Sequence, residues 1–149
     1  MDITTKTNVT RLLDTAHIPY SVLSYEVDEN DLSGVHTAAL VNFQIDQMFK
    51  TLLLRGISGA YFVCCVPVSL EIDLKKADLI AVKELLPLTG YVRGGCSPIG
   101  MKKHFLAFID ESAELYDSIS ISAGVRGALV VLKPQDLIKY VPMITTDIV

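Results

Sequence analysis

The chain has 149 residues, of which 50% are hydrophobic and 20% are charged, and its net charge is −4. This balance is typical of one globular domain with a substantial core, and it excludes a disordered chain. No apolar run approaches the roughly 20 residues of a membrane-spanning helix, and the N-terminus lacks the apolar core of a signal peptide. Three cysteines, two of them adjacent, indicate a reducing compartment. We therefore expect a single cytoplasmic domain over residues 1–149, without a membrane segment and without a metal site.

The first third of the chain predicts a helix, a strand and a second helix. Residues 7–16 carry an apolar stripe at helical spacing, between a threonine suited to an N-cap and the helix-breaking Pro19. Residues 20–27 alternate in the manner of a strand whose two faces are both partly covered. Residues 33–41 then predict a short helix.

The middle of the chain predicts a β-hairpin followed by a helix. Two apolar runs, 49–54 and 60–67, are separated by a loop that contains two glycines. A helical stretch begins after Asp73 and ends near Pro87.

The last third predicts three more strands, at 106–109, 118–122 and 128–132, and a short helix that starts at Lys133. Proline is acceptable in the first turn of that helix. Hairpins with helices between and around them indicate the α+β class. We expect a single domain with one curled, barrel-like sheet, mixed or mostly antiparallel, flanked by helices.

Residues 91–103 form the most informative segment, with three glycines, a proline and three cations. Glycine allows a backbone to approach a ligand closely, and successive amides can form a concave anion-binding nest. The segment therefore predicts a ligand-binding loop, although an ordinary turn between strands has the same composition. The stretch from Lys75 to Lys103 carries a net charge of +4 in a chain that is otherwise −8. Such an island can hold a phosphate, or it can consist of solubilising surface lysines.

Four motifs occur in order along the chain. They are Phe49-Lys50-Thr51-Leu52, Leu74-Lys75-Lys76, the run from Thr89 to Gly100, and the run from Ser122 to Gly127. Together they resemble the YbaK family of prolyl-tRNA-synthetase-associated editing domains, from about Thr7 to Tyr140. Because a threonine follows Lys50, the likeness is closer to the Cys-tRNA(Pro) deacylase branch than to the relatives that act on Ala-tRNA(Pro).

This resemblance implies a trans-editing aminoacyl-tRNA deacylase that removes cysteine from mischarged Cys-tRNA(Pro), with prolyl-tRNA synthetase as a partner and no cofactor. The thiol of the substrate is expected to attack the ester, so that the protein supplies position and charge stabilisation and no nucleophile. Two alternatives stay open. One is a non-catalytic adaptor that binds tRNA or a nucleotide, and the other is an Ala-tRNA(Pro) deacylase that does not need a substrate thiol.

The resemblance also assigns the site. Lys50 is the expected catalytic residue, and its ammonium group inside an apolar strand would be costly to bury without a partner. The expected substrate-binding residues are Tyr25, Thr51, Gly94, Gly95, Ser97, Ser122 and Gly124. The alternatives are an edge-strand lysine that points to water, a packed strand tyrosine at Tyr25 and an ordinary β-branched strand residue at Thr51.

Other reactive side chains are expected to be structural. Cys96 lies in the glycine loop, but no histidine has an obvious claim to be its base, and Cys64 and Cys65 suit an apolar strand. His36 is expected at most at the rim of the site. One departure from the family concerns Lys76 to Thr89, where the chain is about nine residues shorter than its relatives, enough to remove two or more helical turns at about 1.5 Å per residue.

Overall fold

Two β-sheets form the framework of the structure, a computed structural model that describes residues 6–72, 77–79 and 82–149. The strands are β1 (Tyr20–Ser24), β2 (Phe49–Gly56), β3 (Tyr61–Pro67), β4 (Ala77–Leu79), β5 (Leu106–Asp110), β6 (Ile119–Ser122), β7 (Ala128–Leu132) and β8 (Ile144–Thr146). The larger sheet has the order β4-β2-β3-β5-β8, and the smaller has the order β1-β7-β6. The pairs β3–β5 and β5–β8 are parallel and the other pairs are antiparallel, so the larger sheet is mixed.

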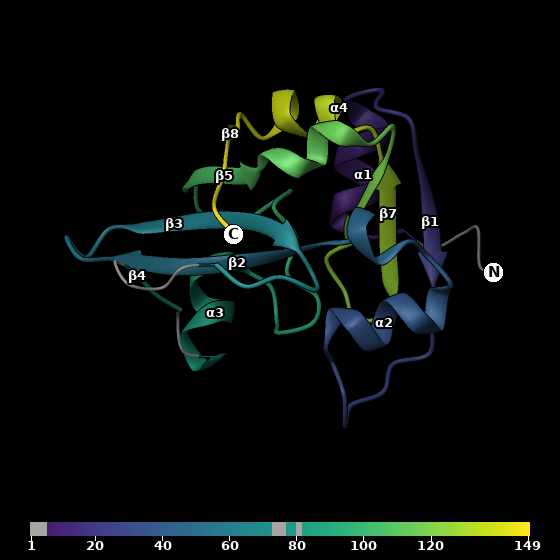
Figure 1. Ribbon diagram of the computed structural model, residues 1–149, viewed down its shortest axis with the longest axis horizontal. Coiled ribbons are helices and arrows are strands. Elements are labelled where there is room, and N and C mark those ends of the chain that lie inside the picture. Colours follow the sequence, from purple (N-terminus) through teal and green to yellow (C-terminus); the bar gives the residue numbers. More distant parts are fainter. Residues whose placement is uncertain (1–5, 73–76, 80–81) are drawn as a thin grey trace.

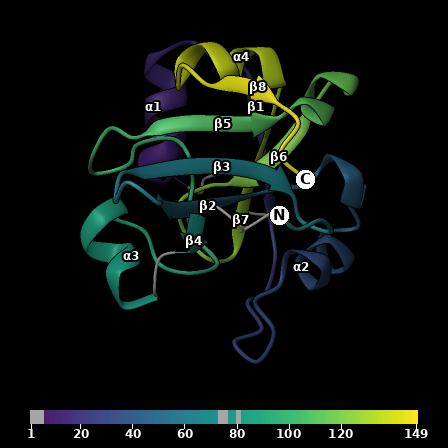
Figure 2. The ribbon, with the colours of Figure 1, turned by 60° about the vertical axis from the view of Figure 1, so that its left-hand side comes forward.

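Four helices surround the sheets in the described part of the chain. They are α1 (Asn8–Thr15), α2 (Gly34–Val41), α3 (Val82–Thr89) and α4 (Pro134–Tyr140), with short 3₁₀ helices at Ile45–Gln47 and Glu111–Leu115. Both ribbon views place α1 and α4 at the end of the molecule near β5 and β8, and α2 and α3 at the opposite end (Figures 1 and 2). None of the helices in the described ranges has the length and apolar character needed to span a bilayer.

The α+β class expected from the sequence is confirmed, but the single barrel-like sheet is not observed. In Figure 1 the strands β1 and β7 cross β2 and β3 at a steep angle. The two sheets meet at an isolated parallel bridge between Met48, just before β2, and Ser120 of β6. Because the pairing stops there, the ladder of the described residues does not close into a barrel.

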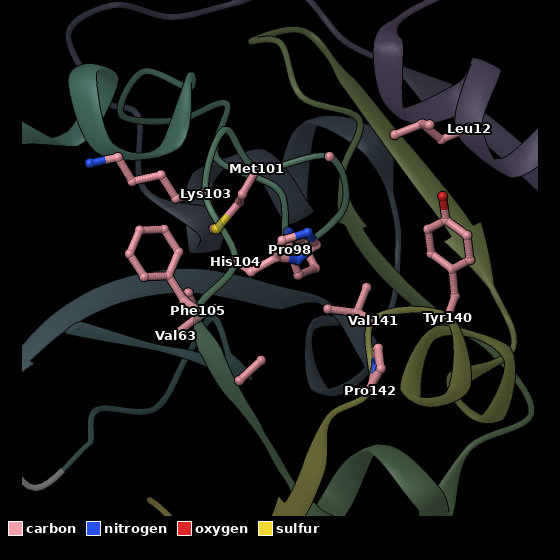
Figure 3. A pocket seen from close by; sticks show the side chains of 12 residues that line it. Leu12, Val63, Pro98, Met101, Lys103, His104, Phe105, Tyr140, Val141 and Pro142 are labelled. Atoms are coloured by element: carbon pink, nitrogen blue, oxygen red, sulfur yellow. The ribbon is translucent and has the colours of Figure 1, made fainter. Parts of the chain in front are cut away.

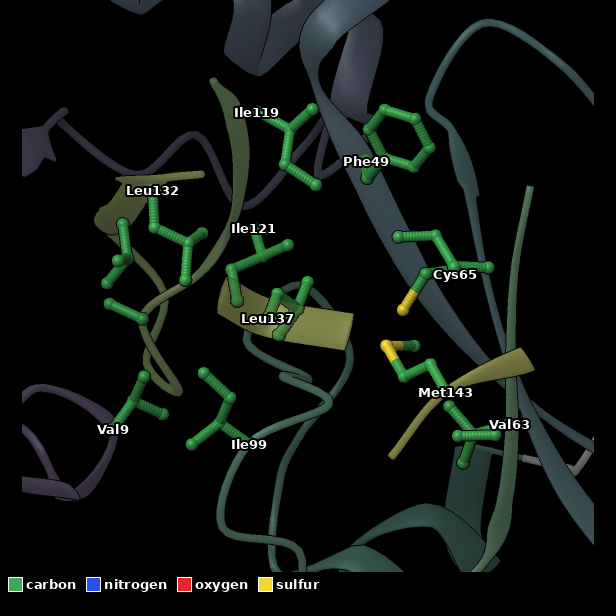
Figure 4. Close-up of a cluster of buried hydrophobic side chains, with 14 of the residues drawn as sticks. Val9, Phe49, Val63, Cys65, Ile99, Ile119, Ile121, Leu132, Leu137 and Met143 are labelled. Atoms are coloured by element: carbon green, nitrogen blue, oxygen red, sulfur yellow. The ribbon is translucent and has the colours of Figure 1, made fainter. Parts of the chain in front are cut away.

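Apolar side chains from both sheets meet in one main core. Phe49 and Cys65 come from the larger sheet, and Ile119 and Ile121 from the smaller one; Leu137 of α4 closes the cluster (Figure 4). All five are at most 3% exposed. Burial of this surface is the dominant stabilising contribution, and it fixes the two sheets against each other.

The predicted hairpin and the predicted first helix are confirmed in detail. β2 and β3 pair in antiparallel register from Phe49 opposite Pro67 to Arg55 opposite Tyr61. Thr7 caps α1, because its side chain accepts a hydrogen bond from the amide of Thr10. The predicted strand at 20–27 is shorter, since β1 ends at Ser24.

The predicted helix from residue 73 to Pro87 is wrong in its first part. Residues 77–79 form β4, which pairs with β2 and places Asp78 opposite Arg55. An open strand edge offers hydrogen bonds that override local helical preference. The helix α3 starts at Val82 and continues through Pro87 to Thr89. Residues 73–76 and 80–81, and with them the motif Leu74-Lys75-Lys76, lie outside the described residues.

Strand β8 was not predicted. It pairs in parallel with β5, opposite Phe108 and Ile109. The buried Asp110 helps to hold the C-terminal segment, because its carboxylate accepts a hydrogen bond from the amide of Ile148 at 3.2 Å. A three-residue strand has too short an apolar pattern to be recognised from sequence.

Candidate functional site

Lys50 lies near the start of β2 with its side chain largely covered. The side chain is 25% exposed, and Nζ lies 3.4 Å from Oε1 of Glu71. Glu71 follows β3 and is 84% exposed, so its carboxylate approaches the ammonium from the solvent side. The ion-pair partner of the ammonium is thus Glu71, which the sequence motifs do not include.

The bridge between Met48 and Ser120 determines which side chains of the smaller sheet point to the same face as Lys50. Paired residues in a bridge point to the same face, and every second residue of a strand returns to that face. Lys50 and Ser122, each two residues further along, therefore point to the same side. Leu129 of β7 lies directly opposite Ser122 and belongs to the same apolar cluster as Met48.

Tyr25 joins this side of the molecule. It packs, half-buried, against a small cluster that contains Met48, Leu129 and Ala38 of α2. Its backbone amide donates to the carbonyl oxygen of Gly127 at 2.9 Å. The fold thus brings three of the expected residues, Tyr25, Lys50 and Ser122, to one side of the two sheets, next to α2.

The N-terminal end of α2 reaches the same region. A Cβ built on Gly34 would overlap the side chain of Val68, so the helix begins in close contact with the residue that follows β3. A Cβ built on Gly94 would lie 3.7 Å from Cβ of Leu32, just before α2. The start of α2 therefore lies between the residue that follows β3 and the glycine-rich loop.

Thr51 lies on the opposite face of β2 from Lys50. Its Oγ1 is 3.5 Å from Sγ of Cys65, and its neighbours in alternation, Phe49 and Leu53, belong to the main core. Consecutive strand residues point to opposite faces. The expectation that Thr51 shares a ligand with Lys50 therefore does not fit this geometry.

The glycine-rich loop packs closely against the loop between β6 and β7. A Cβ built on Gly95 would lie 3.0 Å from the backbone nitrogen of Arg126 and 3.0 Å from the carbonyl carbon of Val125, so only glycine allows the two backbones this approach. Nε of Arg126 donates to the carbonyl oxygen of Arg93 at 2.7 Å. Gly94 itself is exposed and adopts a φ of +85°.

The side-chain hydroxyls of two expected site residues, Ser97 and Ser122, form hydrogen bonds within these loops. Ser97 is fully buried, and its Oγ accepts a hydrogen bond from the amide of Ile99 at 3.3 Å. Oγ of the half-buried Ser122 accepts one from the amide of Gly124 at 3.1 Å. Gly124 adopts a φ of +90°, which other residues reach only with strain. The hydroxyl of Ser97 thus supports the loop from within and is not presented to a ligand.

None of the cysteines is poised as a nucleophile. Burial raises the pKa of Cys65 and Cys96 to about 12 and that of Cys64 to about 11. The thiolate is the reactive form, and at neutral pH these three side chains stay protonated. His36 lies in the first turn of α2, and its Nε2 is 3.2 Å from the carboxylate of Asp28, which precedes the helix. His36 therefore pairs with a surface acid.

Two cavities open elsewhere on the surface. One, of about 350 Å³, lies between α1, α4 and the segment before β5, and its walls include Leu12, Phe105 and Tyr140 (Figure 3). None of the expected site residues lines it. The other, of about 420 Å³, includes Gly124 together with Lys6 and Lys102. Among the described residues, no group of three His, Cys, Asp or Glu side chains lies close enough to hold a metal ion.

Comparisons with known proteins agree with this architecture. The family model described as aminoacyl-tRNA editing domain matches residues 33–140. A relative from Enterococcus faecalis is named "Putative Cys-tRNA(Pro)/Cys-tRNA(Cys) deacylase EbsC". It is 35% identical over an aligned region that covers 89% of this chain and 87% of the relative. A Bacillus subtilis relative, "Uncharacterized protein YwhH", is 23% identical over 75% of this chain and 82% of its own.

Solved structures show the same fold. A "putative trans-editing enzyme for prolyl tRNA synthetase" matches with a TM-score of 0.79 at 21% identity, covering 97% of this chain and 98% of its own. A hypothetical protein matches with a TM-score of 0.84 at 18% identity, covering 95% and 99%. At these identities the likeness establishes the fold alone.

The contact between the two loops predicts that Gly95→Ala destabilises the protein. The added methyl group meets backbone atoms on both sides, and overpacking of this kind costs about 1–3 kcal/mol. Gly56→Ala is the matched control, because a Cβ there has no neighbour closer than 3.6 Å. Urea unfolding of both variants measures the difference. Equal stability of the two variants would contradict the close approach of the loops.

The raised pKa values predict a loss of stability at alkaline pH. The folded chain keeps the three thiols protonated to about pH 11–12, whereas the unfolded chain releases their protons near the ordinary value of 9.0. Ionisation therefore favours the unfolded state, and stability falls as pH rises from 9 toward 12. Urea midpoints between pH 8 and pH 10.5 should decline less steeply for Cys96→Ala than for the unmodified chain. Parallel declines would show that Cys96 ionises normally in the folded state.

Proposed function

This chain belongs to the aminoacyl-tRNA editing domain family, and we propose that it removes cysteine from mischarged Cys-tRNA(Pro). Membership confirms the enzyme class expected from the sequence, an aminoacyl-tRNA deacylase whose substrate is an aminoacyl-tRNA. The choice of cysteine is supported by the relative from Enterococcus faecalis, which is 35% identical to this chain over 142 residues. The proposal also explains why an editing site is needed. The amino acid pocket of a synthetase rejects a near-isosteric amino acid only weakly, and a second, hydrolytic site restores accuracy.

The observation that carries the proposal is the position of the Lys50 ammonium. The Lys50 side chain is 25% exposed, and it lies on the same side of the sheets as Ser122 and Tyr25. A cation held in a partly dry site stabilises charge that develops on an ester oxygen far better than water does. We assign Lys50 to the carbonyl oxygen of the ester, with Tyr25, Ser122 and Gly94 shaping the space for the aminoacyl group.

The nucleophile in this mechanism is the thiol of the substrate. The three cysteines of the chain are protonated near neutral pH, so they do not compete for this role. The substrate sulfur bonds to its own carbonyl carbon, the bond from that carbon to the ribose oxygen breaks, and the thiol proton passes to that oxygen. The products are tRNA with a free hydroxyl and a cyclic thioester, which water then hydrolyses to cysteine.

We propose that prolyl-tRNA synthetase selects tRNA(Pro). The synthetase and this chain would then act together in the cytoplasm. A net charge of −4 gives the chain little general attraction for a polyanion, so recognition of the tRNA body by a partner is the simpler arrangement. The chain then contributes the hydrolytic site and the synthetase contributes the identity of the tRNA.

Removal of the Lys50 ammonium tests the assignment directly. Lys50→Ala should lower the rate of Cys-tRNA(Pro) deacylation at least about a hundredfold, the usual cost of losing one preorganised electrostatic group. Its melting temperature should change little, because the pair with Glu71 is solvent-accessible and such pairs contribute little to stability. Lys139→Ala, at an exposed lysine in α4, is the control. Full activity of Lys50→Ala would contradict the mechanism.

The substrate requirement is tested with cysteine, alanine and serine esters of tRNA(Pro), each with and without prolyl-tRNA synthetase. We expect rapid release from the cysteine ester and sparing of the serine ester, because only the thiol attacks the carbonyl efficiently. Equal release from the alanine ester would assign catalysis to groups of the protein and favour an Ala-tRNA(Pro) deacylase. Release from none of the esters, with tRNA still bound, would indicate a binding adaptor.

A further inference from the structure

The pair of Lys50 and Glu71 carries a carboxylate into the candidate site that the mechanism above does not use. Lys50 is fixed in β2 and 25% exposed, whereas Glu71 is 84% exposed and 3.4 Å away. The strand residue thus holds its place, while the carboxylate lies at the solvent edge and can turn toward an incoming group. The site presents a cation and an anion side by side.

This polarity is a poor match for a phosphate. A carboxylate beside the lysine repels a second anion, and it cancels much of the attraction that the lysine would exert on it. A neutral ester next to a hydrogen-bond donor is a better match. Glu71 therefore argues that Lys50 holds the ester group and not a phosphate of the tRNA backbone.

An aminoacyl ester has the complementary pair of groups on adjacent carbon atoms. Its carbonyl oxygen accepts a hydrogen bond, and its α-amino group donates hydrogen bonds whether or not it is protonated. Ionised acceptors form the stronger hydrogen bonds, especially with a cationic donor. A lysine and a glutamate in contact can thus receive the carbonyl oxygen and the amino group of one aminoacyl ester together.

Building on the proposed function, we propose that Glu71 receives the α-amino group of the aminoacyl ester while Lys50 holds its carbonyl oxygen. Glu71 is then a specificity-determining residue, and the site accepts esters of amino acids with a free amine. N-acylated esters are excluded, because acylation removes the positive charge and places an amide carbonyl next to the carboxylate. Peptidyl-tRNA and other N-blocked aminoacyl-tRNAs are therefore spared.

The test compares Cys-tRNA(Pro) with N-acetyl-Cys-tRNA(Pro), which keeps the thiol and changes only the amine. The unmodified chain should cleave the free-amine ester about ten- to a hundredfold faster, in keeping with a charge-assisted hydrogen bond. Glu71→Gln should reduce this ratio to about threefold or less, mainly by slowing cleavage of the free-amine ester. Glu114→Gln, at an exposed glutamate of the second 3₁₀ helix, should keep the full ratio.

Two results would overturn the proposal. One is a Glu71→Gln variant that keeps the full preference for the free amine. The other is a Glu71→Gln variant that cleaves both esters faster by the same factor. That result would mean that the carboxylate only pairs with Lys50 and keeps it from the substrate. Melting temperatures of both variants show that the comparison is made on folded protein.

A binding measurement separates this proposal from the proposed function. The probe is 3′-cysteinylamino-3′-deoxyadenosine, whose amide bond resists cleavage, with and without an N-acetyl group, titrated by NMR. We expect tighter binding of the free-amine probe to the unmodified chain and loss of that preference in Glu71→Gln. If the chain cleaves no ester, the proposed reaction fails while the binding preference still tests Glu71. Equal binding of both probes to the unmodified chain would overturn the role of Glu71.

Discussion

The bridge between Met48 and Ser120 is the contact on which the candidate site depends. Apolar side chains from the two sheets hold them together without fixing a register along the strands. The parallel bridge, beside which Nε2 of Gln47 donates to the carbonyl oxygen of Ser118 at 2.8 Å, fixes that register, and strand alternation then carries Lys50 and Ser122 to the same side. The position of the ammonium is therefore a consequence of how the two sheets are joined, as much as of the strand in which it lies.

The glycine-rich loop contributes in a different way from what its composition suggests. Gly95 allows its backbone to touch the loop between β6 and β7, and Arg126 ties the two loops together through the carbonyl oxygen of Arg93. Ser97 stabilises the turn from inside. Of the three expected site residues in this loop, Gly94 is the exposed one. Most of this motif is thus needed to assemble the site, and its residues need not contact a substrate to be essential.

Much of this arrangement follows from the sequence, because it depends on local patterns. The hairpin that carries Lys50 and the cap at Thr7 were predicted from alternation and from helix-start signals. Strand periodicity alone separates Lys50 from Thr51, although adjacency in a motif suggests a shared role. The partner of Lys50 was not predictable, since Glu71 is 21 residues away and its contact depends on the turn after β3. The edge strand β4 and the meeting of two sheets likewise depend on tertiary pairing.

Under the proposed function the chain acts on an amino acid with a free thiol, and the protonated state of its own cysteines then has a consequence. An ionised cysteine beside such a site would enter thiol–disulfide exchange with oxidised forms of the released product, and the resulting mixed disulfide would block the loop. Cys96 sits in the glycine-rich loop, yet burial raises its pKa to about 12, so it remains a poor partner for exchange. For a chain that releases cysteine as proposed, the core around this thiol thereby protects the loop from covalent capture by oxidised forms of the product.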